Sequence, residues 1–264
     1  MGYYLRLIGS FARASAQAEL AYRANFWISL LSAGLNLGSG VLGLLVIFGQ
    51  VETVNGWDLN STLAILGVYL TVGNLGSLFF GPSLEALSGM DGEVWTGQLD
   101  FTLLRPLDVQ FQASFRHWRP LAMLDLALGL GVIAVALLRL GQSLTLVNLL
   151  AFALTLLLSV LILYAILLLF AALVFWSPGF LFTWVFNGIF QMARYPLGLY
   201  PGWVRLLLTW VVPVGVITTV PVQALRGDLA PGGFLGALLV AAVLLSGASW
   251  LFRAGLRRYA SASS

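Results

Sequence analysis

Long uninterrupted apolar runs are the main pattern along the chain. Five of them cover residues 26–49, 61–81, 121–140, 146–175 and 233–252, and a shorter one covers residues 180–194. A helix rises about 1.5 Å per residue, so roughly 20 apolar residues are needed to cross the hydrocarbon core of a membrane. The pattern therefore predicts an all-α integral membrane protein in which each long run is a transmembrane helix.

Residues 1–25 have an amphipathic pattern instead. Apolar side chains such as Leu7, Ile8 and Phe11 recur every three or four residues, while Arg6 falls elsewhere around the helix. A helix with one apolar face and a charged opposite face lies flat in the membrane interface. We therefore expect an N-terminal interfacial helix, with a frayed start of the first transmembrane helix as the alternative.

The segment of residues 82–120 is rich in charge. It holds eight charged side chains, which are Glu85, Asp91, Glu93, Asp100, Asp108, Arg105, Arg116 and Arg119. Charges at the centre of a bilayer are costly, so we expect this segment in water or at the interface. The single histidine of the chain, His117, also lies here and is interpreted as an interfacial residue, because one imidazole without other ligands makes no metal site.

Prolines interrupt the apolar sequence of residues 195–228. They are Pro196, Pro201, Pro213 and Pro221, and each lacks the backbone N–H that a continuous helix uses. Non-helical backbone at membrane depth is tolerated only where protein or a water-filled cavity satisfies it. The sequence therefore predicts broken, re-entrant helices in this region.

Arginine placement indicates the orientation. Nine of the thirteen arginines lie in the N-terminal segment, in residues 82–120 and in the C-terminal tail, and positively charged loops face the cytoplasm. Six crossings with both termini inside fit this count if residues 180–194 cross the membrane. A rival topology takes residues 206–225 as the fifth crossing and keeps Arg194 and Arg205 inside. Charge favours the rival and the prolines oppose it, so these residues leave both topologies open.

Composition supports the membrane assignment and excludes several kinds of chemistry. The chain is 60% hydrophobic and 9% charged, against about a quarter charged in an ordinary soluble domain. It contains no cysteine and no lysine, which excludes disulfides, thiolate metal sites and a Walker P-loop, whose lysine binds phosphate. We predict no catalytic, metal-binding or cofactor-binding residues, and we expect membrane lipid rather than nucleic acid as a partner.

Several stretches together resemble the type-2 ABC (ATP-binding cassette) exporter permeases with six spans. The stretches are YRANFW at 22–27, GQLDFTLLRPLD at 97–108, YPLGLYPGWVR at 195–205 and VVPVGVITTVPVQALRGD at 211–228. The resemblance implies six transmembrane helices with residues 180–194 as the fifth. It also implies a cytoplasmic coupling helix within residues 82–120, here called the coupling segment, and an outer re-entrant hairpin over residues 195–228.

The same resemblance implies the partners and the location. Permeases of this group work in the bacterial cytoplasmic (inner) membrane with both termini in the cytoplasm. They pair with a second copy or a similar permease, and separate ABC ATPase subunits bind ATP and Mg. Export direction is implied in the same way, and the substrate is left open.

Three sets of residues are candidates for function. An apolar set bordered by charge suits docking of the ATPase, as a rigid helix in a groove, and consists of Glu93, Trp95, Leu99, Asp100, Leu103, Leu104 and Arg105. Small and carboxamide residues within the spans are candidates for a pathway or a dimer interface, and these are Gly34, Asn36, Gly38, Asn187 and Gln191. Asn74 is a further carboxamide that could line a pathway, and the alternative for all four carboxamides is hydrogen bonding between helices. Asp125 is the candidate intramembrane charge, with structural pairing to Arg23 or Arg119 as the alternative.

Two other functions compete with an ATP-driven exporter. An ion- or proton-coupled secondary transporter is the first, but the chain shows no inverted repeat with paired broken helices. A membrane-embedded enzyme is the second, but neither HExxH nor GxSxG is present.

Overall fold

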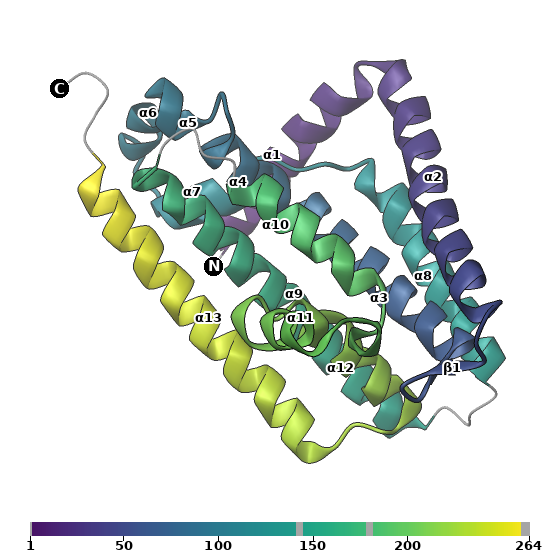
Figure 1. Ribbon diagram of the computed structural model, residues 1–264. Helices are drawn as coiled ribbons and strands as arrows, with labels where there is room; N and C mark the ends of the chain where they lie inside the picture. The colour runs from purple at the N-terminus through teal and green to yellow at the C-terminus, as the bar shows by residue number, and fades with distance from the viewer. Residues whose placement is uncertain (1, 141–144, 178–181, 260–264) are drawn as a thin grey trace.

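The computed structural model describes residues 2–140, 145–177 and 182–259 and confirms an all-α membrane fold (Figure 1). An N-terminal helix, α1 (Gly2–Leu20), is separated from α2 by a turn at residues 21–22 and so is not a frayed start of it. Five described helices are long and apolar enough to cross a membrane. They are α2 (Arg23–Phe48), α3 (Leu59–Phe79), α8 (Ala122–Leu140), α9 (Leu146–Ala172, continued by the 3-10 turn η1, Leu173–Phe175) and α13 (Pro231–Arg258).

The coupling segment forms four short helices rather than one. They are α4 (Gly81–Ser88), α5 (Glu93–Thr96), α6 (Leu99–Leu103) and α7 (Val109–Phe115). Figure 1 shows them gathered at one end of the molecule, where α13 also ends. Glycine sets the breaks: Gly97, with φ of 75°, ends α5 in the left-handed conformation that glycine adopts most easily. The coupling helix that the resemblance implies within this segment stays a prediction.

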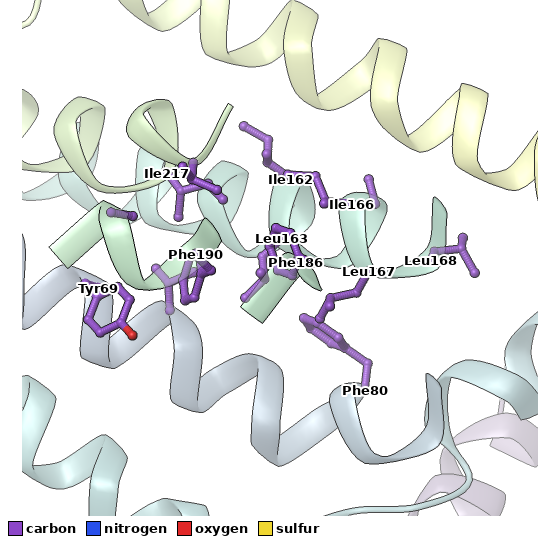
Figure 2. Close-up of a cluster of buried hydrophobic side chains, with 14 of the residues drawn as sticks. Tyr69, Phe80, Ile162, Leu163, Ile166, Leu167, Leu168, Phe186, Phe190 and Ile217 are labelled. Carbon is purple, nitrogen blue, oxygen red and sulfur yellow. The ribbon is translucent and has the colours of Figure 1, made fainter. Parts of the chain in front are cut away.

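The core lies between α3 and α9. Both helices are mostly buried, whereas only about a fifth of the residues in the apolar parts of α2, α8 and α13 are buried. Figure 2 shows Leu163 of α9 beside Phe186 and Phe190, and Leu167 of α9 beside Phe80. Helices that are apolar on the outside as well as inside are suited to a lipid environment, because lipid tails replace water around them.

Small residues bring α3 and α8 together. A Cβ added to Gly67 of α3 would lie 2.9 Å from the backbone nitrogen of Ile133, and one added to Gly129 of α8 would lie 2.9 Å from that of Thr71. Neither glycine has room for a side chain, which allows the two backbones to approach closely, as is usual at membrane helix crossings.

The region before α13 contains the predicted broken helices. The elements are α10 (Phe182–Phe190), the 3-10 turns η2 (Gln191–Arg194) and η3 (Leu197–Leu199), α11 (Gly202–Leu206), the π-helical turn η4 (Leu207–Val211) and α12 (Val214–Arg226). The two apolar halves, Gly202–Val211 and Val214–Arg226, meet at 87° across Pro213, which has no N–H to continue the helix. With α10 only nine residues long, the number of crossings is five by length alone, or six if the bent pair is one span. Residues 180–194 as a fifth span thus stay a prediction.

A small hairpin that we did not predict lies at the end opposite the coupling segment. Strand β1 (Thr53–Val54) pairs antiparallel with β2 (Trp57–Asp58) around Asn55–Gly56, both with positive φ. An Asn-Gly pair between two strand residues on each side is the usual signal for this turn. The Asn55 side chain donates a hydrogen bond of 2.7 Å to the Gly198 carbonyl, so the hairpin fixes the start of the broken region.

Asp58 of this hairpin also begins α3. Its carboxylate accepts a hydrogen bond of 3.1 Å from the Ser61 backbone N–H and caps the helix. Burial acts to raise the pKa of Asp58, but the hydrogen bonds from Ser61 outweigh it and lower the pKa. The cap therefore stays ionised at neutral pH.

Candidate functional site

A cavity of about 680 Å³ lies among α2, α3, α9 and α10 and extends to α1 and α4. All four carboxamide residues predicted to line a pathway border it, namely Asn36, Asn74, Asn187 and Gln191. Apolar residues from α3, α9 and α10 form the rest of its deep wall. The structure thus brings together, in one place, side chains that are up to 155 positions apart between Asn36 and Gln191.

Two predicted glycines lie elsewhere. Gly34 and Gly38 are on α2, and an added Cβ at either would meet no atom within 4 Å. They do not line the cavity and face open space in the single chain. Their role, in a pathway or at a dimer interface, stays a prediction.

The end of the cavity nearest the coupling segment carries charge. Glu19 of α1 accepts a hydrogen bond of 2.9 Å from the Leu121 backbone N–H and lies 3.8 Å from the Arg119 guanidinium. His117 lies beside them, and burial, followed by the positive charge of Arg116, lowers its pKa. The imidazole is therefore neutral at pH 7, which agrees with the interpretation of His117 as an interfacial residue.

Arg194 does not line the cavity itself but contacts two residues that do, Asn36 and Tyr69, and the sequence analysis used it only for orientation. Its guanidinium donates a hydrogen bond of 2.8 Å to the Asn36 side-chain oxygen and lies 5.2 Å from the centre of the Tyr69 ring. A signal for it exists in the sequence, because no acidic residue occurs between Asp125 and Asp228 although Arg194 falls between them. An arginine in so long an apolar region without a nearby acid is unusual.

The coupling segment is held together by an ion pair. The Glu93 carboxylate lies 2.8 Å from the Arg116 guanidinium and accepts a hydrogen bond of 3.1 Å from the Thr102 hydroxyl. These three residues come from α5, from the residue after α7 and from α6, so one cluster connects three of the short helices. Glu93, which we predicted as a docking residue, is thus engaged inside the segment.

Two more of the predicted docking residues face inward. Leu99 is fully buried, so it stabilises the segment and offers no surface to a partner. Asp100 faces the end of α13, because burial and the negative charge of Asp100 raise the pKa of Tyr259. Tyr259 in turn contacts Phe175 edge to face, which connects the segment to the ends of α9 and α13.

The remaining predicted residues are exposed, and together with Phe101 they are here called the docking patch. Trp95 is 59% exposed and Leu104 is 82% exposed, with Leu103 and the charged Arg105 beside them in sequence. Phe101, which is 69% exposed, belongs to the same short helices and was not predicted. Its signal was its place within the DFTLLR sequence, three residues before Leu104 and hence on the same helical face.

Asp125 lies in the first turn of α8 and is half-buried. It makes no salt bridge with any residue that the structure describes, and Arg119 pairs with Glu19 instead. Neither of the two partners that we considered therefore forms an ion pair with it. Within the described ranges, no cluster of three or more histidine or acidic side chains suited to a metal ion is present.

A family model described as "ABC-2 family transporter protein" matches residues 35–263, which is most of the chain and includes the coupling segment, the broken helices and all of the cavity lining except the residues from α1. No curated protein matches the sequence.

Proposed function

We propose, from the premise that the chain belongs to the ABC-2 family of transporter proteins, that it is the permease subunit of an ATP-driven exporter. Family membership makes it a multi-pass membrane component of an ABC transporter. The proposal adds that a separate ATPase supplies the energy, that the coupling segment receives it, and that both termini face the cytoplasm of a bacterial cell. Nine of thirteen arginines support that orientation.

The docking patch is the observation that carries this proposal. Trp95, Phe101 and Leu104 are large apolar side chains on short helices outside the spans, where water surrounds a single chain. Exposed apolar patches bordered by charge mark protein interfaces, and aromatic residues at their centre contribute most of the binding energy. The Glu93–Arg116 ion pair and the Thr102 hydroxyl connect the short helices that carry these residues, which supports a fixed arrangement for docking.

We expect the triple substitution W95A/F101A/L104A to abolish co-purification of the permease with its ATPase. Loss of one central anchor typically costs about 2 kcal/mol, or roughly 30-fold in affinity, and three together remove the contact. Pull-down of the ATPase and ATP hydrolysis by the reconstituted complex are the measurements. Trp210→Ala is the matched control, because Trp210 is 76% exposed and lies in η4, among the broken helices and outside the coupling segment. Equal ATPase recovery by the triple variant and the control would contradict the proposal.

The cavity is the proposed pathway, and a second permease is proposed to complete it. Asn187 and Gln191 line the cavity and are themselves exposed, so the cavity wall is open to the outside of the single chain. The open glycine face belongs to α2, the helix that contributes Asn36 to the same cavity, and small residues allow close helix approach. We propose that Gly34 and Gly38 contact a second copy or a similar permease.

The cysteine-free sequence makes this contact testable. We expect Gly34→Cys to give a disulfide-linked dimer in membranes after mild oxidation, because a two-fold axis along α2 would place the two thiols within bonding distance. Gly236→Cys on α13 is the control, since Gly236 also meets nothing within 4 Å but lies away from α2. Denaturing gels give the measurement. If Gly34→Cys gives only monomer in a sample that still binds the ATPase, the interface between permeases does not lie on this face of α2.

Gradient-driven transport is the competing mechanism, and one experiment distinguishes it from ATP-driven transport. Its candidate carboxylate, Asp125, lies in the first turn of α8 and not at the centre of a span. Transport by the purified chain alone in a proton gradient, with no ATPase recovered from membranes, would replace our proposal with that mechanism.

A further inference from the structure

A second cavity lies between α2, α3 and α8, and the proposed function leaves it without a role. Its volume is about 510 Å³, and none of the residues that line it borders the cavity described above. It is open along its side, because Leu45 on the α2 wall is 50% exposed and Val135 on the α8 wall is 45% exposed. We call it the lateral groove, and it is a separate site from the proposed pathway.

The lateral groove has the length and the lining of a site for one hydrocarbon chain. On α8 its lining extends from Ala127 to Arg139, a rise of about 18 Å at about 1.5 Å per residue. One leaflet contributes half of the hydrocarbon core, which is about 15 Å. Every described lining residue except Arg139 is aliphatic or glycine. A lipid chain that lies along the membrane normal therefore matches the groove in length and in polarity.

Arg139 is the one charged residue among the described residues that line the groove. It lies in the last turn of α8, a helix that begins directly after the coupling segment and is long enough to cross the bilayer. Arg139 is therefore at the opposite membrane face, and Figure 1 shows this end of α8 near β1. It is exposed and makes no salt bridge with any residue that the structure describes. The carbonyl end of α8 favours a cation but carries only about half a charge, so most of the charge of Arg139 is left for a partner at headgroup level.

The acidic residues at this membrane face do not take up that charge. Asp58 is engaged as the cap of α3, where it accepts the Ser61 backbone N–H. Glu52 is exposed in the loop before β1 and forms no salt bridge within the described ranges. Further along the sequence, no acidic residue occurs between Asp125 and Asp228, and Asp228 pairs with Arg226 at 2.9 Å.

We infer that the lateral groove binds one anionic phospholipid, with a chain lying between α2 and α8 and with its phosphate paired to Arg139. Guanidinium suits phosphate because its planar N–H pairs match two oxygens at once. A basic residue beside a hydrocarbon surface between transmembrane helices is the combination that recognises anionic lipid headgroups. The inference goes beyond the proposed function, since it concerns a lipid that the permease holds and not the substrate that it moves.

A helix of a second permease matches the groove less well than a lipid. With its side chains a helix is about 10–12 Å wide, so a piece as long as the groove fills roughly 1,400 Å³ or more, against about 510 Å³ available. Such a helix would also have to bring a carboxylate to Arg139, whereas every phospholipid carries its phosphate at that level. The proposed contact through Gly34 and Gly38 does not require the groove, because neither glycine lines it.

The test uses the permease–ATPase complex, purified in detergent without added lipid. Dioleoylphosphatidylglycerol and dioleoylphosphatidylcholine are titrated separately, and native mass spectrometry counts the molecules bound. The two probes share their chains and their phosphate and differ in net charge. We expect the first lipid per permease to bind about fivefold more tightly when it is phosphatidylglycerol, as one cationic side chain at an anionic headgroup provides. The same titration of the permease chain alone gives this reading independently of ATPase binding.

Three substitutions separate the charge from the groove. Arg139→Gln is expected to make the two lipids bind equally, and Arg139→Lys to keep most of the preference because it keeps the charge. Gly131→Phe is expected to weaken binding of both lipids at least fivefold, because Gly131 lines the groove and an added Cβ meets nothing within 4 Å, so the ring enters open space. The matched controls are Arg205→Gln and Leu130→Phe, since both residues are exposed and neither lines the groove.

Each outcome has a defined meaning once size exclusion has shown that the variants are folded. Equal binding of the two lipids to the unmodified chain, or a preference that Arg139→Gln leaves intact, would overturn the inference. Lipid binding by Gly131→Phe that equals that of Leu130→Phe would overturn it too, and a loss of permease dimers in that variant would assign the groove to a second copy. Failure to bind any ATPase, with the lipid preference present, would contradict the proposed function alone.

Discussion

Gly129→Val is expected to remove most of the folded protein from membranes. The added Cβ alone would lie 2.9 Å from the backbone nitrogen of Thr71, so α8 and α3 must move apart along their whole contact. Overpacking of this kind costs typically 1–3 kcal/mol, and backbone atoms cannot rotate away as a side chain can. We expect a melting temperature lower by roughly 5–10 °C and little monodisperse protein after extraction.

Substitution of Gly67, on the α3 side of the same contact, is expected to have the same effect. A Cβ on Gly67 would lie 2.9 Å from the Ile133 nitrogen and 3.3 Å from the Gly129 carbonyl oxygen, so Gly67→Val opens the same crossing. Because the two glycines share one contact, the double variant should lose less than the sum of the single losses. Size-exclusion profiles and thermal unfolding followed by circular dichroism measure both.

Gly131→Val is the control for this crossing. Gly131 is two residues from Gly129 on α8, but an added Cβ there meets nothing within 4 Å. Its substitution changes helix propensity by a similar amount and leaves the α3–α8 distance unchanged. Equal stability losses for Gly129→Val and Gly131→Val would mean that the close approach of α3 and α8 is not what stabilises the fold.

The long helices could be predicted from the sequence because their signal is strong. An apolar run of about 20 residues matches the thickness of the hydrocarbon core, whereas the apolar runs of buried helices in soluble domains are shorter. The five long helices begin within three residues of the predicted runs, and residues 146–175 coincide with α9 and η1 together. The C-terminal end of α13 was the exception, since it continues to Arg258 beyond the apolar run, where charged residues extend the helix past the membrane.

Which side chains of the coupling segment are buried and which are exposed could not be predicted from the sequence. Helices of four to eight residues are too short for periodicity to identify a buried face. Leu99 and Leu104 therefore had equal standing in the sequence, yet one is fully buried and the other is 82% exposed. Packing against distant elements decides between them, and it also engages Glu93 and Asp100, which looked like surface charges.

The cavity could be predicted only in part from the sequence. The carboxamides could be selected as a set because polar residues within spans are few. Their close approach could not be predicted, because a sequence gives no distance between α2 and α10. Arg194 was missed for a different reason: it was counted with the other arginines as a sign of orientation. Its neighbours Asn36 and Tyr69, which do line the cavity, come from two other helices.

Reversal of the Glu93 charge is expected to uncouple the proposed transporter. In Glu93→Arg two guanidinium groups would face each other where the carboxylate now lies 2.8 Å from Arg116, and the Thr102 hydroxyl would lose its acceptor. Removing one partner of a buried pair costs about 3–5 kcal/mol, and this pair is only partly buried, with 28% and 15% of its two side chains exposed, so about 2 kcal/mol is the expected loss. The short helices then no longer hold the docking patch rigid, and ATPase binding and ATP-driven transport should both fall at least tenfold.

The charge swap E93R/R116E distinguishes the ion pair from a general effect of charge. It restores opposite charges at the same two positions, so we expect ATPase binding to recover to within a few fold of the unmodified chain, whereas either single reversal stays inactive. Asp91→Arg is the matched control, since Asp91 is exposed two residues before Glu93 and makes no described salt bridge. Recovery in the double variant would show that Glu93 acts through Arg116 to position the patch. A double variant as inactive as the single ones, while still folded by circular dichroism, would mean instead that Glu93 or Arg116 contacts the ATPase directly.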